Sequence, residues 1–219
     1  MKTICVIPAY NEEKTIGGLA RTVKDQGYDV LVVDDGSRDR TAALAREAGA
    51  EVLINPQNMG KGASLRRAFV LVTSRGYDAV VVMDADGQHL PADVRRLLEQ
   101  LEETGADMVV GNRMLKATGM PFLRWVTNKS MSLLLSLMCR QYIPDSQCGF
   151  RALRMPLLKT LALQTENFEI ESEMLLEAAR HGFKIASAPI ATVYEGQYSA
   201  IHPWKDTVRF FKLLFKINR

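Results

Sequence analysis

The feature that most constrains the fold of this chain is a short apolar run that ends in carboxylates. The run Val80-Val81-Val82-Met83 continues directly into Asp84-Ala85-Asp86-Gly87-Gln88-His89. Four consecutive residues of this kind are typical of an internal strand of a parallel sheet, and open α/β sheets bind ligands at the carboxyl ends of their strands. Unpaired carboxylates at such an edge repel each other. We therefore expect them to share a hard cation, Mg2+ or Mn2+, with a phosphate-bearing ligand.

Two other interpretations of the same segment compete with a cation site. Asp-x-Asp-Gly is also a common turn in which the aspartates are solvated. An EF-hand loop is excluded by spacing, because His89 and Arg95 stand where that loop needs a glycine and a bidentate glutamate.

Short β-type runs alternate with segments of helical period through the first half of the chain, which is typical of a parallel sheet with crossover helices. We predict strands at residues 4–7, 30–33, 52–54, 79–83 and 108–110. Between the last two strands, Val94, Leu97, Leu98 and Leu101 follow the spacing of a helix that packs on a core. The pattern predicts an α/β fold with a doubly wound, mostly parallel nucleotide-binding sheet.

Charge and cysteine usage exclude several classes of protein. The net charge is +3, which is too weakly basic to indicate nucleic acid as a partner. The three cysteines, Cys5, Cys139 and Cys148, are scattered in or beside apolar runs, which predicts reduced thiols and neither a disulfide frame nor a zinc site. The chain runs into a strand without a signal peptide, and its longest apolar stretch is too short to span a bilayer. We expect a cytoplasmic protein, soluble or peripheral on the cytoplasmic face of the membrane.

Polar loops also follow the other early strands. The first is Pro8-Ala9-Tyr10-Asn11-Glu12, whose proline and tyrosine could pack against a nucleotide base while the glutamate contacts the edge of the base or the ribose. The second is Asp34-Asp35-Gly36-Ser37, which offers carboxylates to ribose hydroxyls but is also an ordinary turn and helix cap. The third is Asn58-Met59-Gly60-Lys61-Gly62, whose exposed backbone and lysine suit phosphate contact at a helix start, although it lacks the spacing of a P-loop.

These loops, followed by Gly111-Asn112-Arg113 and Asp145-Ser146-Gln147-Cys148-Gly149-Phe150-Arg151, form an ordered series. The series resembles the family 2 glycosyltransferases of GT-A fold, and most closely the dolichyl-phosphate mannosyltransferase-like and polyprenyl-phosphate glycosyltransferase branch. The resemblance covers residues 4 to 193. It implies metal-dependent, inverting transfer of a hexose of mannose or glucose type from a GDP- or UDP-linked sugar to an acceptor, expected to be a polyprenyl or dolichyl phosphate. Transfer to a sugar hydroxyl of a cell-surface glycan, or a non-catalytic nucleotide-sugar-binding partner subunit, are the alternatives.

The resemblance also implies roles for individual residues. The positions that match the nucleotide-sugar site are Pro8, Ala9, Tyr10, Glu12, Asp35, Lys61, Asp84 and Ala85. Asp84, Asp86 and Gln88 match the motif that binds the divalent metal and the donor diphosphate. Arg113, Arg124 and Asn128 match the residues that grip the acceptor phosphate, although Asn128 stands where the family has a serine. The residues expected to carry catalysis are Asp86, Arg113, Arg124 and Asp145.

The role of Asp145 depends on the acceptor. A lipid monophosphate has a second pKa near ~6 and is mostly ionised at neutral pH, so arginines that position it suffice. A sugar hydroxyl needs a general base, for which Asp145 is the candidate. The other interpretation of Asp145 is a structural turn or cap before Gly149.

Two rival enzyme classes fit less well. A haloacid-dehalogenase-type phosphatase would carry threonine or valine at the position of Gln88, and a sugar-phosphate nucleotidyltransferase would open with a glycine-rich motif that is missing here. Elsewhere, we interpret Glu169-Ile170-Glu171-Ser172-Glu173 as the solvated first turn of a helix, where carboxylates are favourable, with a direct role in the site as the alternative. We interpret His89 as a local hydrogen-bonding residue, with an approach to the metal as the alternative.

We expect a single glycosyltransferase domain over residues 1–219, with a nucleotide-sugar-binding half at 1–113, an acceptor half at 114–200 and an amphipathic helix at 201–219. In that last segment Trp204, Val208, Phe211, Leu214 and Phe215 share a face opposite lysines and arginines. Docking on the domain and lying in a membrane interface remain equally open for it. Together with residues 131–138, it is our candidate for contact with a membrane surface or a membrane partner protein.

Overall fold

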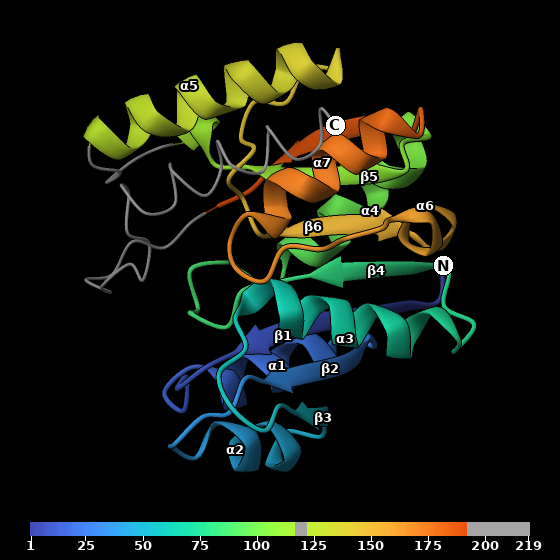
Figure 1. Ribbon diagram of the computed structural model, residues 1–219. Coiled ribbons are helices and arrows are strands. Elements are labelled where there is room, and N and C mark those ends of the chain that lie inside the picture. The colour runs from blue at the N-terminus through green and yellow to red at the C-terminus, as the bar shows by residue number, and fades with distance from the viewer. Residues whose placement is uncertain (117–121, 192–219) are drawn as a thin grey trace.

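The computed structural model describes residues 1–116 and 122–191 (Figure 1). The predicted C-terminal amphipathic helix lies outside these residues.

A seven-stranded sheet of order β3-β2-β1-β4-β6-β5-β7 forms the centre of the molecule. Its strands are β1 (Thr3–Ala9), β2 (Asp29–Asp34), β3 (Glu51–Ile54), β4 (Ala79–Val82), β5 (Met108–Asn112), β6 (Arg151–Arg154) and β7 (Ile185–Pro189). Only β6 runs antiparallel to its neighbours. The five predicted strands and the mostly parallel sheet are therefore confirmed, while β6 and β7 were not predicted.

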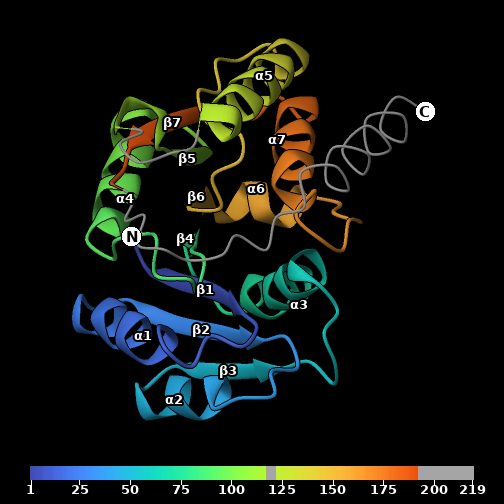
Figure 2. The ribbon, with the colours of Figure 1, turned by 90° about the vertical axis from the view of Figure 1, so that its left-hand side faces the viewer.

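Helices cover both sides of this sheet. They are α1 (Ile16–Asp25), α2 (Thr41–Glu47), α3 (Lys61–Thr73), α4 (Asp93–Thr104), α5 (Phe122–Cys139), α6 (Met155–Thr160) and α7 (Ile170–Arg180), with a 3-10 turn η1 (Met114–Lys116). In Figure 2, α4 lies on one side of the sheet and α3, α6 and α7 lie on the other. Helix α5 packs against α7 at the end of the sheet formed by β5 and β7.

Helix α4 shows how the apolar pattern becomes packing. Val94, Leu97, Leu98 and Leu101 are all buried, as their spacing predicts. Burying each such side chain contributes about 1.5–3 kcal/mol. The helix ends at Gly105, whose φ of +61° is the left-handed conformation that glycine adopts without strain.

The three cysteines are buried and free, in agreement with the predicted reduced thiols. Burial raises the pKa of Cys139 to about 11 and that of Cys148 to about 12. These thiols are therefore protonated at neutral pH and serve as small core residues.

The topology brings loops that are distant in sequence to one edge of the sheet. The parallel register of β1 with β2 pairs Ala9 with Asp34, so the loops after both strands start at the same level. The loops after β4 and β5 emerge at this edge as well. Strand β6 is antiparallel, and its first residue, Arg151, pairs with Val82 at the end of β4. The loop that precedes β6 therefore lies at the same edge of the sheet as the loops that follow β1, β2, β4 and β5. Residues 145–150 thus face the loops of the first half of the chain.

Candidate active site

A cleft of about 840 Å³ opens at this edge of the sheet. This size is within the range of small-molecule sites in proteins, about 300–1,000 Å³. All eight positions matched to the nucleotide-sugar site line the cleft, as do Asp86, Gln88 and Arg113. Gln147 and Phe168 complete the opposite wall.

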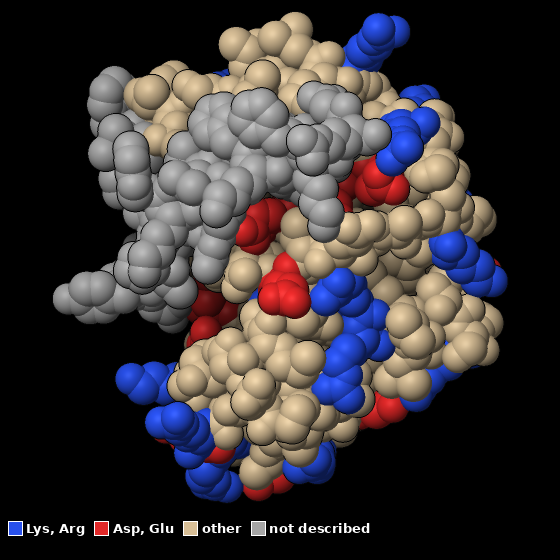
Figure 3. Space-filling model, viewed as in Figure 1, with Lys and Arg blue, Asp and Glu red and all other residues tan. Residues whose placement is uncertain are grey.

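The cleft is rich in acidic groups. Seven carboxylate side chains line it, against the cationic side chains of Lys14, Lys61 and Arg113. In the view of Figure 3, several acidic side chains lie near the middle of the molecule and many lysines and arginines lie toward its outline. Burial raises the pKa of Glu12; a hydrogen bond from Thr15 opposes this shift, and the charges of neighbouring aspartates add to it. The site therefore disfavours additional negative charge unless a cation accompanies it.

Lys61 joins carboxylates from both halves of the chain. Its Nζ lies 2.5 Å from Asp84 Oδ1 and 2.6 Å from Glu171 Oε1. Burial alone would lower the pKa of Lys61, but the two carboxylates outweigh burial and raise it. Burial would likewise raise the pKa of Asp84, but Lys61 and His89 outweigh it and lower that pKa. Lys61 and Asp84 are thus a charged pair at neutral pH.

The glycines beside Lys61 do not expose backbone to a ligand as the sequence suggested. The N–H groups of Gly62 and Ala63 donate to the carbonyl of Glu166, at 2.8 and 3.2 Å. A Cβ on Gly62 would come within 2.5 Å of the carbonyl oxygen of Thr165. The loop before α7 covers the start of α3, and the glycines permit that close approach. The predicted phosphate contact by this backbone is therefore wrong.

Asp35 lines the cleft but is only 5% exposed, and its carboxylate is mostly engaged by protein donors. It accepts N–H bonds from Met59 at 2.9 Å and Gly60 at 2.8 Å, and one from Asn55 Nδ2 at 2.6 Å. A carboxylate has about four acceptor positions, so three protein donors leave it little capacity for a ligand. Asp35 mainly fixes the loop that carries Lys61.

The chemistry of Asp86 and Gln88 fits a hard cation. Asp86 lines the cleft and accepts only the turn N–H of Gln88, at 2.9 Å, among the bonds described for it. Asp84 is different, because Lys61 and His89 contact its two oxygens. The Lys61 ammonium thus lies against Asp84 in this structure, and the roles of Asp84, Asp86 and Gln88 as metal ligands stay a prediction. Within the described residues, no three His, Cys, Asp or Glu side chains could hold a metal by themselves. A cation here needs oxygens from its ligand, as Mg2+ commonly does with phosphates.

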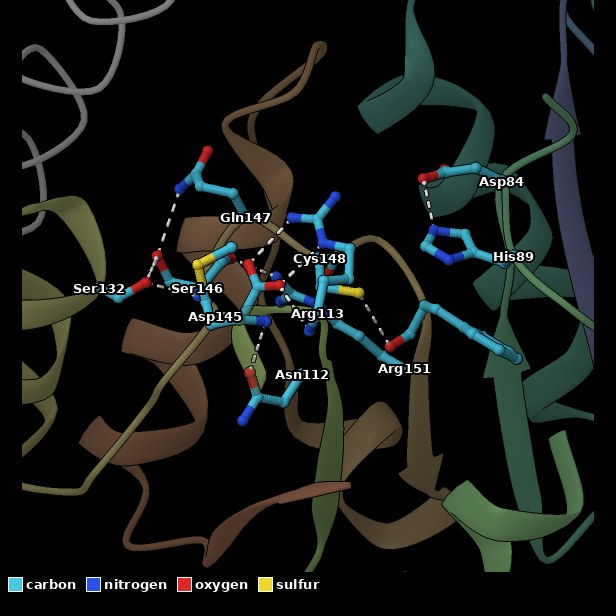
Figure 4. A network of polar contacts seen from close by, with 12 residues as sticks. Asp84, His89, Asn112, Arg113, Ser132, Asp145, Ser146, Gln147, Cys148 and Arg151 are labelled. Atoms are coloured by element: carbon cyan, nitrogen blue, oxygen red, sulfur yellow. Dashed lines mark hydrogen bonds and ion pairs between the residues drawn. The ribbon is translucent and has the colours of Figure 1, made fainter. Parts of the chain in front are cut away.

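Arg113 and Asp145 form a buried, bidentate ion pair (Figure 4). Arg113 Nε donates to Asp145 Oδ2 at 2.8 Å, Nη2 donates to Oδ1 at 2.9 Å, and the backbone N–H of Arg113 donates to Oδ2 at 3.1 Å. Asp145 is 1% exposed and does not line the cleft, whereas Arg113 does. This geometry does not support the predicted general base, because both carboxylate oxygens are occupied. Asp145 orients Arg113.

The other predicted acceptor residues lie on α5. Asn128 is buried and is not among the described residues that line the cleft. Arg124 belongs to α5, but its side chain lies outside the described part of the structure. Their role in holding a phosphate stays a prediction.

Comparison with known proteins identifies the family. A model of the family described as glycosyl transferase family 2 matches residues 4–162. The chain belongs to this family. Its sheet, with one antiparallel strand, is that of the GT-A glycosyltransferases, which confirms the predicted fold and enzyme class.

Relatives of this glycosyltransferase include enzymes named for lipid phosphates. It is 32% identical over 216 residues to a UDP-N-acetylglucosamine–dolichyl-phosphate N-acetylglucosaminyltransferase of Methanococcus voltae, covering 86% of this chain and 84% of that protein. It is 34% identical over 210 residues to an undecaprenyl-phosphate mannosyltransferase of Micrococcus luteus, covering 88% and 84%. The resemblance to the polyprenyl-phosphate branch is confirmed.

A solved structure with the same fold is glucosyl-3-phosphoglycerate synthase from Mycobacterium tuberculosis in complex with Mn2+, UDP and phosphoglyceric acid. The TM-score is 0.73 at 20% identity, covering 96% of this chain and 75% of that one. At this identity the likeness shows the fold alone.

Sequence reasoning favoured a solvated turn over a site role for the acidic residues of α7 in this glycosyltransferase. Glu171 and Glu173 are 6% and 4% exposed, so the predicted solvated first turn is wrong. Glu171 lines the cleft and binds Lys61, while Glu173 accepts the backbone N–H groups of Gln164 and Thr165 at 2.8 and 2.9 Å. The available signal was the uncharged residues Ile170 and Ser172 between the glutamates, because a helical turn cannot expose all three acids at once. His89 is buried against Asp84 and Phe150, which agrees with its predicted local role.

Proposed function

We propose that this glycosyltransferase moves a hexose, with inversion, from a UDP- or GDP-linked sugar to a polyprenyl phosphate, and that it requires Mg2+ or Mn2+. The observation that carries the proposal is the placement of Asp86, Gln88 and Arg113 in one cleft. Oxygen ligands for a cation and a guanidinium for an anion are the two groups that such a transfer needs.

The donor side is supported by the loops after β1 and β4. Tyr10 is 40% exposed at the cleft and offers its ring to a nucleotide base. Glu12 also lines the cleft, close enough to Asp84 and Asp86 for their charges to act on it. Asp86 and Gln88 would hold the metal, which offsets the charge that develops on the leaving diphosphate. A relative named for a UDP-linked sugar, and structural neighbours crystallised with UDP and Mn2+ or Mg2+, support this donor class.

The acceptor side is supported by Arg113. Its guanidinium is fixed by Asp145 through two parallel hydrogen bonds, so little conformational freedom is lost when it binds an anion. A monoester phosphate is already ionised at neutral pH and needs positioning more than deprotonation. A sugar hydroxyl would need a base, and Asp145 is occupied. This difference favours a lipid phosphate, in line with the names of the relatives.

The outer face of α5 supports access to a bilayer. Leu133 is 64% exposed and Leu137 is 68% exposed, one helical turn apart, while Leu135 on the inner face is fully buried. Tyr142, beyond the end of the helix, is 77% exposed. No helix among the described residues is long and apolar enough to cross a membrane. We propose that α5 rests on the membrane surface beside the acceptor.

The proposal is tested by a thermal-shift panel of UDP- and GDP-sugars with Mn2+, followed by transfer to a short polyprenyl phosphate. We expect transfer only with a divalent cation, and Asp86→Ala is expected to abolish transfer without changing the melting temperature. Asp25→Ala, at an exposed aspartate at the end of α1, is the matched control and should remain active. An active Asp86→Ala enzyme would refute the metal assignment, and a wild-type protein that transfers to glycans but not to lipid phosphate would refute the acceptor.

A further inference from the structure

Glu171 contacts the donor site without belonging to any loop of the donor half. It is the second residue of α7, 110 residues after Lys61, and its side chain is 7% exposed. Its Oε1 accepts a hydrogen bond from Lys61 Nζ at 2.6 Å, and the same ammonium lies 2.5 Å from Asp84 Oδ1. One lysine therefore connects the acidic loop after β4 to the first turn of α7.

The backbone of Glu171 is fixed in turn by a buried arginine. Arg151 is 0% exposed, and its Nη1 donates to the carbonyl of Glu171 at 2.5 Å. Its other nitrogens donate to the carbonyls of Cys148 at 2.8 Å and Ser146 at 2.7 Å. The position of Glu171 is thus tied to the loop between Asp145 and β6, which also carries the partner of Arg113.

The backbone of Gly149 lies against the Lys61–Asp84 pair. A Cβ at this residue would clash with the carboxylate of Asp84 and would lie 2.7 Å from Lys61 Nζ. The φ angle of Gly149 is not in the left-handed region, so close approach alone requires a glycine here. The backbone at Gly149 and the carboxylate of Glu171 confine Lys61 and Asp84 from two directions.

This confinement affects which carboxylate of the acidic loop is available to a cation. With Lys61 held at Asp84, Asp86 and Gln88 are the oxygen-bearing side chains of that loop that remain for the metal and diphosphate. If Lys61 were free to move, it could pair with Asp86 instead and compete with the metal.

We propose that Glu171 is a positioning residue for the donor site: it holds Lys61 on Asp84 and so keeps Asp86 open to the metal and the donor diphosphate. The inference rests on the proposed function. It assigns no contact between Glu171 and the reacting atoms.

The test compares Glu171→Gln with Glu173→Gln. Both glutamates are buried on the first turn of α7 and both accept hydrogen bonds, but Glu173 bonds the loop at 164–165 and does not line the cleft. A merely structural role predicts similar losses of stability and unchanged kinetics for both variants. A positioning role predicts that Glu171→Gln alone lowers kcat/KM for the nucleotide-sugar, by about tenfold or more. It should also weaken Mn2+ binding to the UDP-bound protein, measured directly by electron paramagnetic resonance.

The outcomes separate the inference from the proposed function. A wild-type protein that neither binds UDP with Mn2+ nor transfers sugar refutes the proposed function. An active wild-type protein with Glu171→Gln unchanged in kcat/KM and in Mn2+ affinity refutes the positioning role alone.

Should Glu171→Gln fail to fold, Gly149→Ala perturbs the same pair without touching Glu171. It is expected to reduce Mn2+ affinity and kcat/KM in the same direction, because its Cβ displaces Lys61 or Asp84. Unchanged values for a folded Gly149→Ala protein would overturn the inference.

Discussion

Replacing Asp145 with asparagine tests how strongly the buried ion pair that orients Arg113 stabilises the fold. The carboxylate accepts three N–H bonds from Arg113, two of them at Oδ2, and its side chain is 0% exposed beside a guanidinium that is 6% exposed. An asparagine can keep the two bonds at Oδ2 if its amide oxygen takes that position. Its NH2 group then replaces Oδ1, and this donor faces the Nη2 donor of Arg113, so the third bond is lost. Removing one partner of a buried ion pair costs about 3–5 kcal/mol. Because two of the three bonds survive, we expect the lower end, about 3 kcal/mol, which lowers the melting temperature by about 6–12 °C for a chain of this size.

The assay is urea unfolding at neutral pH, with the slope checked so that a change of midpoint reports a change of stability. The matched control is Glu51→Gln, which breaks another bidentate pair: Glu51 contacts Arg75 at 2.5 and 2.8 Å, but the side chains are 48% and 31% exposed. An exposed pair of this kind contributes about 0–1 kcal/mol. If the two variants lost the same free energy of unfolding, the reasoning from burial would be wrong.

Three further perturbations follow from the structure. The pKa of Glu12 is raised in the folded protein, so the folded state binds more protons there and stability falls as pH rises through that range; Glu12→Gln should stabilise the protein near about pH 7 but not below about pH 4. Gly60 has φ +90° and faces a backbone carbonyl, so Gly60→Ala should cost at least about 1 kcal/mol more than Gly49→Ala, which has φ +82° and open space. Replacing Leu133 and Leu137 together by serine should reduce flotation with liposomes that contain polyprenyl phosphate, because these side chains form the exposed face of α5.

Each of these results has a control that can contradict it. A gain for Glu12→Gln that persists at low pH would mean that titration is not its cause. Equal losses for the two glycine variants would show that the loop before α7 yields to the extra carbon. Val70, 76% exposed on α3, supplies the control for flotation, because Val70→Ser removes a similarly exposed apolar group from another surface.

The fold was predictable where one strand or helix carries its own signal. The β4 run and the leucines of α4 show their burial in their spacing, and both lie where the sequence predicts. Strand β6 gave no such signal, because its four residues begin and end with arginine, whereas the four residues of β4 are all apolar. Arg151 can be buried only because three carbonyl groups accept its hydrogen bonds, and those carbonyls are positioned by the tertiary fold.

The candidate site was predictable as a set of loops but not as a set of partners. The residues matched to the donor site do line one cleft. The pairing of Lys61 with Glu171 and of Arg113 with Asp145 joins residues 110 and 32 positions apart, and no local pattern encodes it. For the same reason, the sequence singled out Asp86 for catalysis but could not show that Asp84 is paired with Lys61.

These pairings determine how the cleft can bind an anionic diphosphate. Lys61 lies against two carboxylates and Arg113 against one. Among the other charged side chains that line the cleft, Lys14 is outnumbered by Glu12, Glu13, Asp39 and Asp86. The described side chains alone therefore offer a diphosphate little net attraction, and a divalent cation must bring the missing charge. We expect UDP to bind at least about tenfold more tightly with Mn2+ than without it, a difference of about 1.4 kcal/mol that calorimetry resolves. Asp86→Asn, which keeps the shape of the side chain, should remove most of that difference while leaving metal-free binding unchanged. If wild-type protein bound UDP equally well in the presence of a chelator, the cleft would have to hold a cationic group that this charge balance leaves out.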